Sequence, residues 1–178
     1  GPTVDLRSES IKPGKLAETL MAMANAEGGV ILLGVDGRHG RVAGLHHPQE
    51  TQRSVLESML LCDPPLIIPL PQILAMDDAL AVLVVVVPAG LPHVYNLHGH
   101  YLGRMGALNK PLGALDLKRL LIQRGEISYE ALPVSGASYE DLDPVKVRRY
   151  LSLFRSGLDM PPEEILRNRG CLIKEGDK

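Results

Sequence analysis

The segment from Leu16 to Leu45 constrains the fold more than any other part of this chain. It reads LAETLMAMANAEGGVILLGVDGRHGRVAGL, so apolar residues at helical spacing precede two glycines, an aliphatic run and an Asp-Gly pair. This pattern predicts a helix that ends at Gly28 and Gly29, a strand over 30–35, a tight turn and a return strand over 41–45. Because the first strand is almost wholly apolar, we expect it to be covered on both faces.

A structural motif is expected at the two ends of this strand. Asn25 and the glycine pair precede the strand, Gly34 lies near its end, and Asp36 follows it. Glycine lets the chain reverse tightly or lets another segment approach closely, and Asn25 can hydrogen-bond to backbone at the end of the helix. Any functional site in this region is therefore expected at these strand ends, formed by Asn25, Gly28, Gly29, Gly34 and Asp36.

The remaining sequence alternates between helical and extended patterns. Prolines or aspartates mark the helix starts, and aliphatic runs mark the strands, with the run over 79–87 expected at the centre of a sheet and the proline-broken run over 69–74 at its edge. The other predicted elements are a helix over 48–61, a hairpin over 94–105, a helix from Asp116, an extended segment over 129–136, and helices from Asp143 and Pro161. This order predicts an α/β (α+β) fold, a mixed sheet with flanking helices, followed by a C-terminal helical extension.

Length and composition limit the class of protein. The 178 residues, 45% of them hydrophobic, allow one domain over 3–125 and an extension over 126–178 that leads to a further region, with residues 1–2 the remnant of a removed tag. A net charge of −2 means that any nucleic-acid or membrane partner must meet a local basic patch. The longest apolar run is too short for a membrane helix, and no signal peptide is visible, so we expect a cytoplasmic protein with no membrane partner.

Several common kinds of catalytic or metal site are absent from the sequence. Gly14-Lys15 suggests a phosphate-binding loop, but Leu16 stands where serine or threonine would bind magnesium, and Glu9 stands where the first glycine is required. Cys62 and Cys171 fit no zinc spacing and are expected to be reduced. The six histidines are expected to be solvated loop residues, so we predict neither a metal nor another cofactor.

Two carboxylates remain as weak catalytic candidates. Asp5 precedes the first helix and Asp36 follows the next strand, so the two meet if the N-terminal segment pairs beside that strand. A carboxylate cluster of this kind can hold Mg²⁺ or Mn²⁺ for phosphodiester cleavage. Alternatively, Asp36 is only the first residue of an Asp-Gly turn, and Asp5 is a solvated residue near the chain end.

Basic residues on glycine-rich turns are the better candidates for a binding site. Arg38 and Arg41 flank the turn after the strand, and Arg104 and Lys110 lie in the glycine-rich segment over 103–111. On such turns, bare backbone N–H groups and a side-chain cation can approach a phosphate together. Other basic groups, on predicted helices, are explained by solvated helix faces.

Four short motifs together resemble the AlbA-like domain of the Schlafen type. This family combines an E-F-K segment, a helix ending A-F-A-N-x-x-G-G, a strand ending G-V-D-D and a later Y-x-R-x-G-S strand. The corresponding segments here are VDLR (4–7), MAMANAEGG (21–29), GVDG (34–37) and YLGRMG (101–106). The segment over 129–133 and the helix after Asp143 resemble the region that follows this domain in bacterial members described as divergent AAA or RecG-like proteins.

The resemblance implies a nucleic-acid-binding module, more for DNA than RNA, within a longer bacterial transcriptional regulator that forms a homo-oligomer such as a dimer. Arg38, Arg41, Arg104 and Lys110, with Arg7, are the residues expected to contact phosphate. Schlafen members that cleave RNA draw a carboxylate triad from the E-F-K and G-V-D-D segments. Here Asp5 replaces the glutamate, and Gly37 occupies the second-acid position, so the triad is incomplete. A metal-dependent ribonuclease and a ligand-free oligomerisation module remain the alternatives.

Overall fold

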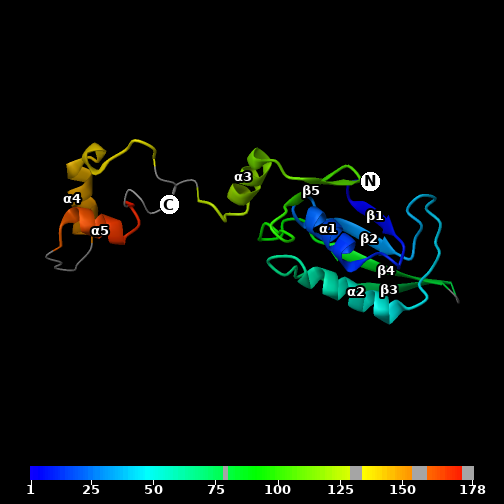
Figure 1. The fold of residues 1–178 in the computed structure, drawn as a ribbon. Coiled ribbons are helices and arrows are strands. Elements are labelled where there is room, and N and C mark those ends of the chain that lie inside the picture. The colour runs from blue at the N-terminus through cyan, green and yellow to red at the C-terminus, as the bar shows by residue number, and fades with distance from the viewer. Residues whose placement is uncertain (78–79, 129–133, 154–159, 174–178) are drawn as a thin grey trace. The chain divides into compact units, whose positions relative to one another are not determined.

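The fold is given by a computed structural model that describes residues 1–77, 80–128, 134–153 and 160–173. The chain divides into two compact units, which we call unit 1 (Gly1–Glu126) and unit 2 (Ile127–Lys178). In these described ranges, unit 1 contains a mixed four-stranded sheet, a two-stranded sheet and three α-helices, and unit 2 contains two α-helices and a 3₁₀ turn (Figure 1). The predicted α/β fold with a helical extension is confirmed.

The main sheet has the strand order β1-β2-β4-β3. Its strands are β1 (Val4–Arg7), β2 (Gly29–Leu33), β4 (Leu80–Val87) and β3 (Gln72–Asp77). β1 runs parallel to β2, and the other two contacts are antiparallel. The most apolar run is therefore central and the proline-broken run forms an edge, as predicted, although the edge strand begins three residues later than the sequence suggested.

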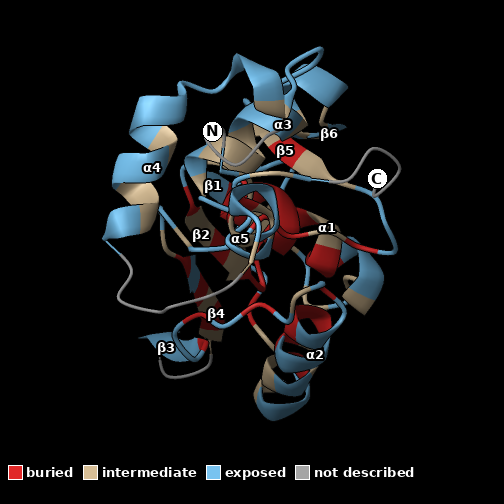
Figure 2. Ribbon diagram, turned by 90° about the vertical axis from the view of Figure 1, so that its left-hand side faces the viewer, coloured by how far each residue is buried: buried red, intermediate tan, exposed pale blue. Residues whose placement is uncertain are grey.

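Helices α1 (Pro13–Ala24) and α2 (Pro48–Leu60) cover one face of this sheet (Figure 1). Both begin with proline in the first turn, where the missing N–H costs nothing. The core between helices and sheet is almost wholly aliphatic, and Figure 2 shows that buried residues concentrate on α1 and on the central strands. Burial raises the pKa of the Cys62 thiol to about 11, so this free cysteine is a neutral core residue.

The opposite face of the sheet is open, which corrects one expectation. Along β2, Ile31 and Leu33 are buried against the helices, but Val30 and Leu32 are only half-buried. On the neighbouring strand, Val86 is 43% exposed. The apolar run of β2 is therefore covered on one face, and its second aliphatic face remains accessible.

The segments around the sheet differ from the sequence prediction in two places. The expected return strand over 41–45 is reduced to a single bridge between Val35 and Val42. The expected hairpin keeps its tight turn at His98-Gly99, but the strands that pair are β5 (Leu102–Met105) and β6 (Leu108–Pro111). The sequence identified the segment over 103–111 only as glycine-rich, because short strands with few aliphatic residues carry little periodic signal.

Helix α3 (Ala114–Gln123) closes unit 1, and unit 2 holds η2 (Tyr139–Asp141), α4 (Pro144–Ser152) and α5 (Pro162–Asn168). The Asp143 carboxylate accepts hydrogen bonds from the first-turn amides of α4, which confirms the predicted cap. Much of the extended segment expected over 129–136 lies outside the described residues. In the part of the chain that the structure describes, no helix is both long and apolar enough to span a lipid bilayer.

Candidate functional site

The parallel pairing of β1 and β2 brings the two candidate carboxylates to one depression. Asp5 is in register with Ile31 of β2, and Asp36 follows the end of the same strand. A depression of about 460 Å³ lies between them. Its charged side chains are those of Asp5, Arg7, Asp36, Arg38 and Arg104. The condition set by the sequence, that the N-terminal segment lies beside the strand, is therefore met.

Asp5 is the centre of an ion-pair cluster in this depression. Its Oδ2 atom lies 2.6 Å from Nη2 of Arg104, and its Oδ1 atom lies 2.7 Å from Nε of Arg7. Arg7 also donates from Nη2 to Oδ2 at 3.2 Å. The Asp5 side chain is only 8% exposed, so the expectation of a solvated chain-end residue is wrong.

Arg104 is fixed on every side. Its Nη1 atom donates to Oδ1 of Asn109 at 2.7 Å, and its Nε atom donates to the Pro2 carbonyl oxygen at 3.3 Å. Asn109 in turn donates to the Thr19 hydroxyl on α1, which links the small hairpin to the helix. With its side chain 2% exposed, Arg104 holds Asp5 in place and is not itself presented to solvent.

The turn after β2 presents the exposed cations. The Asp36 carboxylate accepts a hydrogen bond from the Arg38 amide at 2.9 Å and lies 2.6 Å from Nδ1 of His39. This is the Asp-Gly turn that the sequence offered as one alternative for Asp36. Arg38 and Arg41 are exposed on either side of the turn tip. Gly37 passes so close to the Leu6 carbonyl that a side chain there would collide with β1.

The hydrogen bond from His39, together with that from the Arg38 amide, lowers the pKa of Asp36 below its ordinary value. The charged carboxylate is therefore favoured in the folded turn. The stabilisation is present above the ordinary aspartate pKa and is lost as the pH falls through the lowered folded value.

We expect the Asp36 carboxyl resonance, followed by NMR, to titrate with a midpoint below that of the same residue in urea-unfolded protein. In His39→Ala, the midpoint should move back up towards the unfolded value, because the largest cause of the shift is gone. A midpoint that is unchanged by His39→Ala would show that the side-chain contact does not set it.

The two other predicted cations lie outside the depression. Arg41 is exposed beyond the turn, and Lys110 is exposed on β6, where it is in register with Gly103. The structure thus brings Arg7, Arg38 and Arg104 together but leaves Arg41 and Lys110 on the surrounding surface.

The described residues do not fit a divalent metal at this site. Asp5 is neutralised by two guanidinium groups, and the Asp36 carboxylate is committed to its turn. Within the described ranges, no three His, Cys, Asp or Glu side chains gather where they could hold an ion. All six histidines are exposed, as predicted, and His46 pairs with Glu9 at 2.7 Å.

The predicted glycine-and-asparagine motif is a structural junction. Asn25 follows α1, and its side-chain amide donates to the carbonyl oxygens of Tyr95 and Leu102 and accepts from the Tyr95 amide. A side chain at Gly34 would press against Gly44, and side chains at Gly28 or Gly29 would collide with neighbouring backbone. These residues hold the parts of unit 1 together and do not line the depression.

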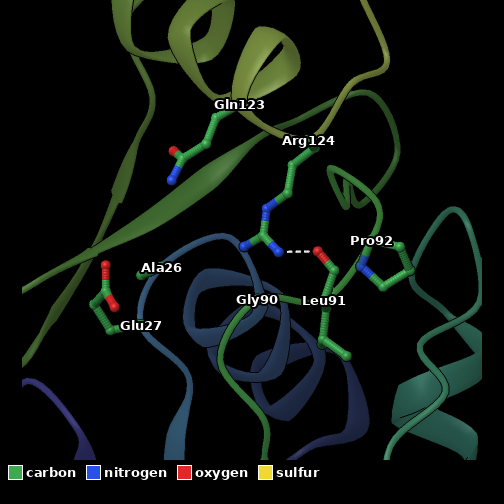
Figure 3. Close-up of a pocket in the computed structure, with 7 residues that line it drawn as sticks. All are labelled: Ala26, Glu27, Gly90, Leu91, Pro92, Gln123 and Arg124. Carbon is green, nitrogen blue, oxygen red and sulfur yellow. Dashed lines mark hydrogen bonds between the residues drawn. The ribbon is translucent and has the colours of Figure 1, made fainter.

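Sequence reasoning missed Arg124, which joins α3 to the end of α1. Its guanidinium donates to the carbonyl oxygen of Leu91 (Figure 3). It also donates to the carbonyl oxygen of Ala24, the last residue of α1. A cation at this end satisfies a helix carbonyl that has no partner within the helix. Nothing in the local sequence distinguishes Arg124 from the solvated cations of α3, because its partners are distant in the chain.

A family model described as Schlafen, AlbA_2 matches residues 1–113. Among solved structures, the DIP2311 protein from Corynebacterium diphtheriae is 19% identical with a TM-score of 0.50, over 96% of this chain and 37% of that protein. The N-terminal domain of a RecG-related protein from Nitrosomonas europaea is 26% identical with a TM-score of 0.46, over 60% of this chain and 80% of that domain. The likeness to DIP2311 concerns the fold. A search of curated proteins finds no match.

Proposed function

Because the chain belongs to the Schlafen AlbA_2 family, we propose that unit 1 binds nucleic acid through the depression beside β1 and the Arg38–Arg41 turn. The observation that carries this proposal is a depression whose charged side chains are three arginines and two aspartates, in a chain whose net charge is −2. A local basic site is what a mildly acidic chain needs to hold a polyanion.

The proposed roles follow from exposure. Arg38, Arg41 and Lys110 are exposed and contact phosphate directly, and the half-exposed Arg7 joins them at the rim. The Arg104 side chain is almost wholly buried, so it acts through Asp5 and not by direct contact.

We further propose DNA over RNA, a bacterial and cytoplasmic protein, and a role in transcription regulation. The chain spans 37% of the length of the DIP2311 protein. The motifs that resemble those of bacterial regulators support the role. The net charge of −2 supports a specific site over general attraction to polyanions.

Salt-dependent binding is the expected result. We expect labelled duplex DNA to bind in a fluorescence anisotropy titration at low salt, with affinity that falls steeply towards physiological salt because phosphate contacts release counterions. Arg38→Ala with Arg41→Ala should reduce the log–log salt slope by about two and weaken binding at least tenfold. An RNA hairpin of equal length tests the preference for DNA.

The matched control is Arg119→Ala, which removes one positive charge from an 81% exposed side chain on α3. Arg119→Ala should bind DNA with the same log–log salt slope as the parent protein. Equal losses in Arg119→Ala and in each single turn variant would show a general charge effect. No binding of either polymer at tens of micromolar would contradict the proposed function.

A second candidate function is assembly of copies of this chain, and the open aliphatic face favours it. Val4, Val30 and Val86 are in register across three strands of that face, and β3 is an edge strand with Leu74 and Met76 half exposed. Apolar strands exposed on a face and at an edge are surfaces through which sheets pair. A homo-oligomer of this kind would place several basic depressions in one particle.

Solution mass tests this assembly. If it forms, Val86→Lys should lower the mass measured by light scattering towards that of the single chain, because it puts a charge on the open face. Ile67→Lys is the control, since Ile67 is 83% exposed and lies outside the strands. A single-chain mass for the parent at every concentration would contradict assembly.

A further inference from the structure

The Asp5 cluster joins one carboxylate to two arginines of very different exposure. The side chain of Arg104 is 2% exposed, whereas that of Arg7 is 38% exposed. Both line the depression, together with Arg38. Asp5 lies between them with its side chain 8% exposed. One cation of the cluster is thus internal, and the other is open to whatever enters the depression.

The two arginines are also held differently. Arg104 has Asp5, Asn109 and the Pro2 carbonyl oxygen as partners, so its guanidinium is fixed from three directions. Among the described residues, the Arg7 guanidinium makes polar contacts with Asp5 alone. Moreover, the buried Nε atom of Arg7 makes no hydrogen bond, although it lies 2.7 Å from Oδ1. The Arg7–Asp5 ion pair is therefore close, but its Nε–H bond is not aligned with the Asp5 oxygen.

We propose that Arg7 exchanges partners: Asp5 is its counter-ion in the free protein, and a backbone phosphate replaces Asp5 when nucleic acid enters the depression. This inference rests on the proposed function and adds to it a residue, Asp5, that sets affinity by competing with phosphate for Arg7.

The exchange leaves no buried charge unpaired. Asp5 keeps Arg104 as its partner at 2.6 Å, so its carboxylate remains compensated after Arg7 has moved. Arg7 loses a pair that is partly open to solvent and gains a phosphate, whose oxygens can accept two parallel donors from one guanidinium. The unused Nε donor of Arg7 becomes part of that bidentate contact.

Inorganic phosphate tests the exchange without nucleic acid. In NMR spectra of the full chain, phosphate should shift the Arg7 Nε–Hε resonance saturably and leave the Arg104 resonance in place, because only Arg7 changes partner. If both resonances respond, or neither does, the exchange is refuted. This outcome does not depend on whether DNA or RNA binds.

A double-mutant cycle with duplex DNA tests the competition itself. Asp5→Asn should raise affinity about tenfold in the parent, since Arg7 is released for phosphate, and should change little in an Arg7→Gln background. Asp116→Asn, at a 64% exposed side chain on α3, is the control for loss of one negative charge and should behave alike in both backgrounds. Equal gains from Asp5→Asn with and without Arg7 would overturn the proposal.

Two further measurements distinguish a failure of the exchange from a failure of the proposed function. Circular dichroism checks that Asp5→Asn is folded, and if it is not, the phosphate titration of the unaltered chain decides. Parent protein that binds no nucleic acid contradicts the proposed function, whereas the Arg7 response to phosphate still confirms or refutes the exchange.

Discussion

Replacing Asn25 with alanine is expected to lower the free energy of unfolding of unit 1 by about 3–5 kcal/mol. The side chain is buried, at 6% exposure, and makes hydrogen bonds of 2.7–2.9 Å to three backbone groups of Tyr95 and Leu102. Alanine leaves a donor and two acceptors without partners, the two Tyr95 groups at buried positions and the Leu102 carbonyl at a part-buried one. Each such buried group costs about 1–3 kcal/mol.

Hydrogen exchange of the β2 and β4 amides measures this effect, because these central strands open only when unit 1 unfolds. Asn96→Ala is a matched control. Asn96 also takes part in three hydrogen bonds, to Asp63 and Gly99, but at exposed positions where water can replace them. We expect a loss below about 1 kcal/mol for Asn96→Ala. Equal losses in the two variants would show that burial of the Asn25 bonds is not what matters.

Replacing Gly28 with alanine is expected to cost at least about 4 kcal/mol, which is the second large effect. Gly28 has a φ of 70°, where side-chain residues are strained, and an added Cβ would lie less than 3.0 Å from backbone atoms of Val87, Pro88 and Ala89. Backbone of the central strand cannot move aside without breaking its pairing with β2. The backbone strain and the steric collision therefore both lower the free energy of unfolding.

Gly90→Ala separates these two causes. Gly90 has the same φ of 70°, but nothing lies within 4 Å of its added Cβ. Gly90→Ala should lower the free energy of unfolding only by the backbone strain, about 1–2 kcal/mol, in the same hydrogen-exchange experiment. If Gly28→Ala costs no more than Gly90→Ala, the close approach of β4 to the glycine pair is not a constraint on the fold.

Much of the secondary structure could be predicted because its causes are local. The prolines that start α1 and α2, the aspartate that caps α4, and the aliphatic run of β4 each act within a few residues. The glycine pair was correctly placed between the first helix and strand for the same reason. The errors fall where local signal is weak, as in the missing return strand over 41–45 and the unpredicted pairing of β5 with β6.

The candidate site was predicted in part. The sequence identified the cations and the two aspartates as candidates, and made the meeting of Asp5 with Asp36 conditional on strand pairing that the structure contains. The sequence analysis treated Arg104 like the exposed cations, because the spacing of residues does not show how exposed a side chain will be. Arg104 becomes buried, while Arg7 and Arg38 stay open to solvent, only when the folded chain places β5 beside Asp5.

The sequence by itself determined the identity and start of most elements and the turn at Asp36, since helix caps, proline geometry and side-chain periodicity are properties of neighbouring residues. Only the tertiary structure decided which distant groups become partners. Asn25 and Tyr95 are 70 positions apart, and Arg124 and Ala24 are 100 positions apart. Such pairs depend on strand order and on the packing of whole elements, because buried polar groups take whichever partners the surrounding fold brings within reach.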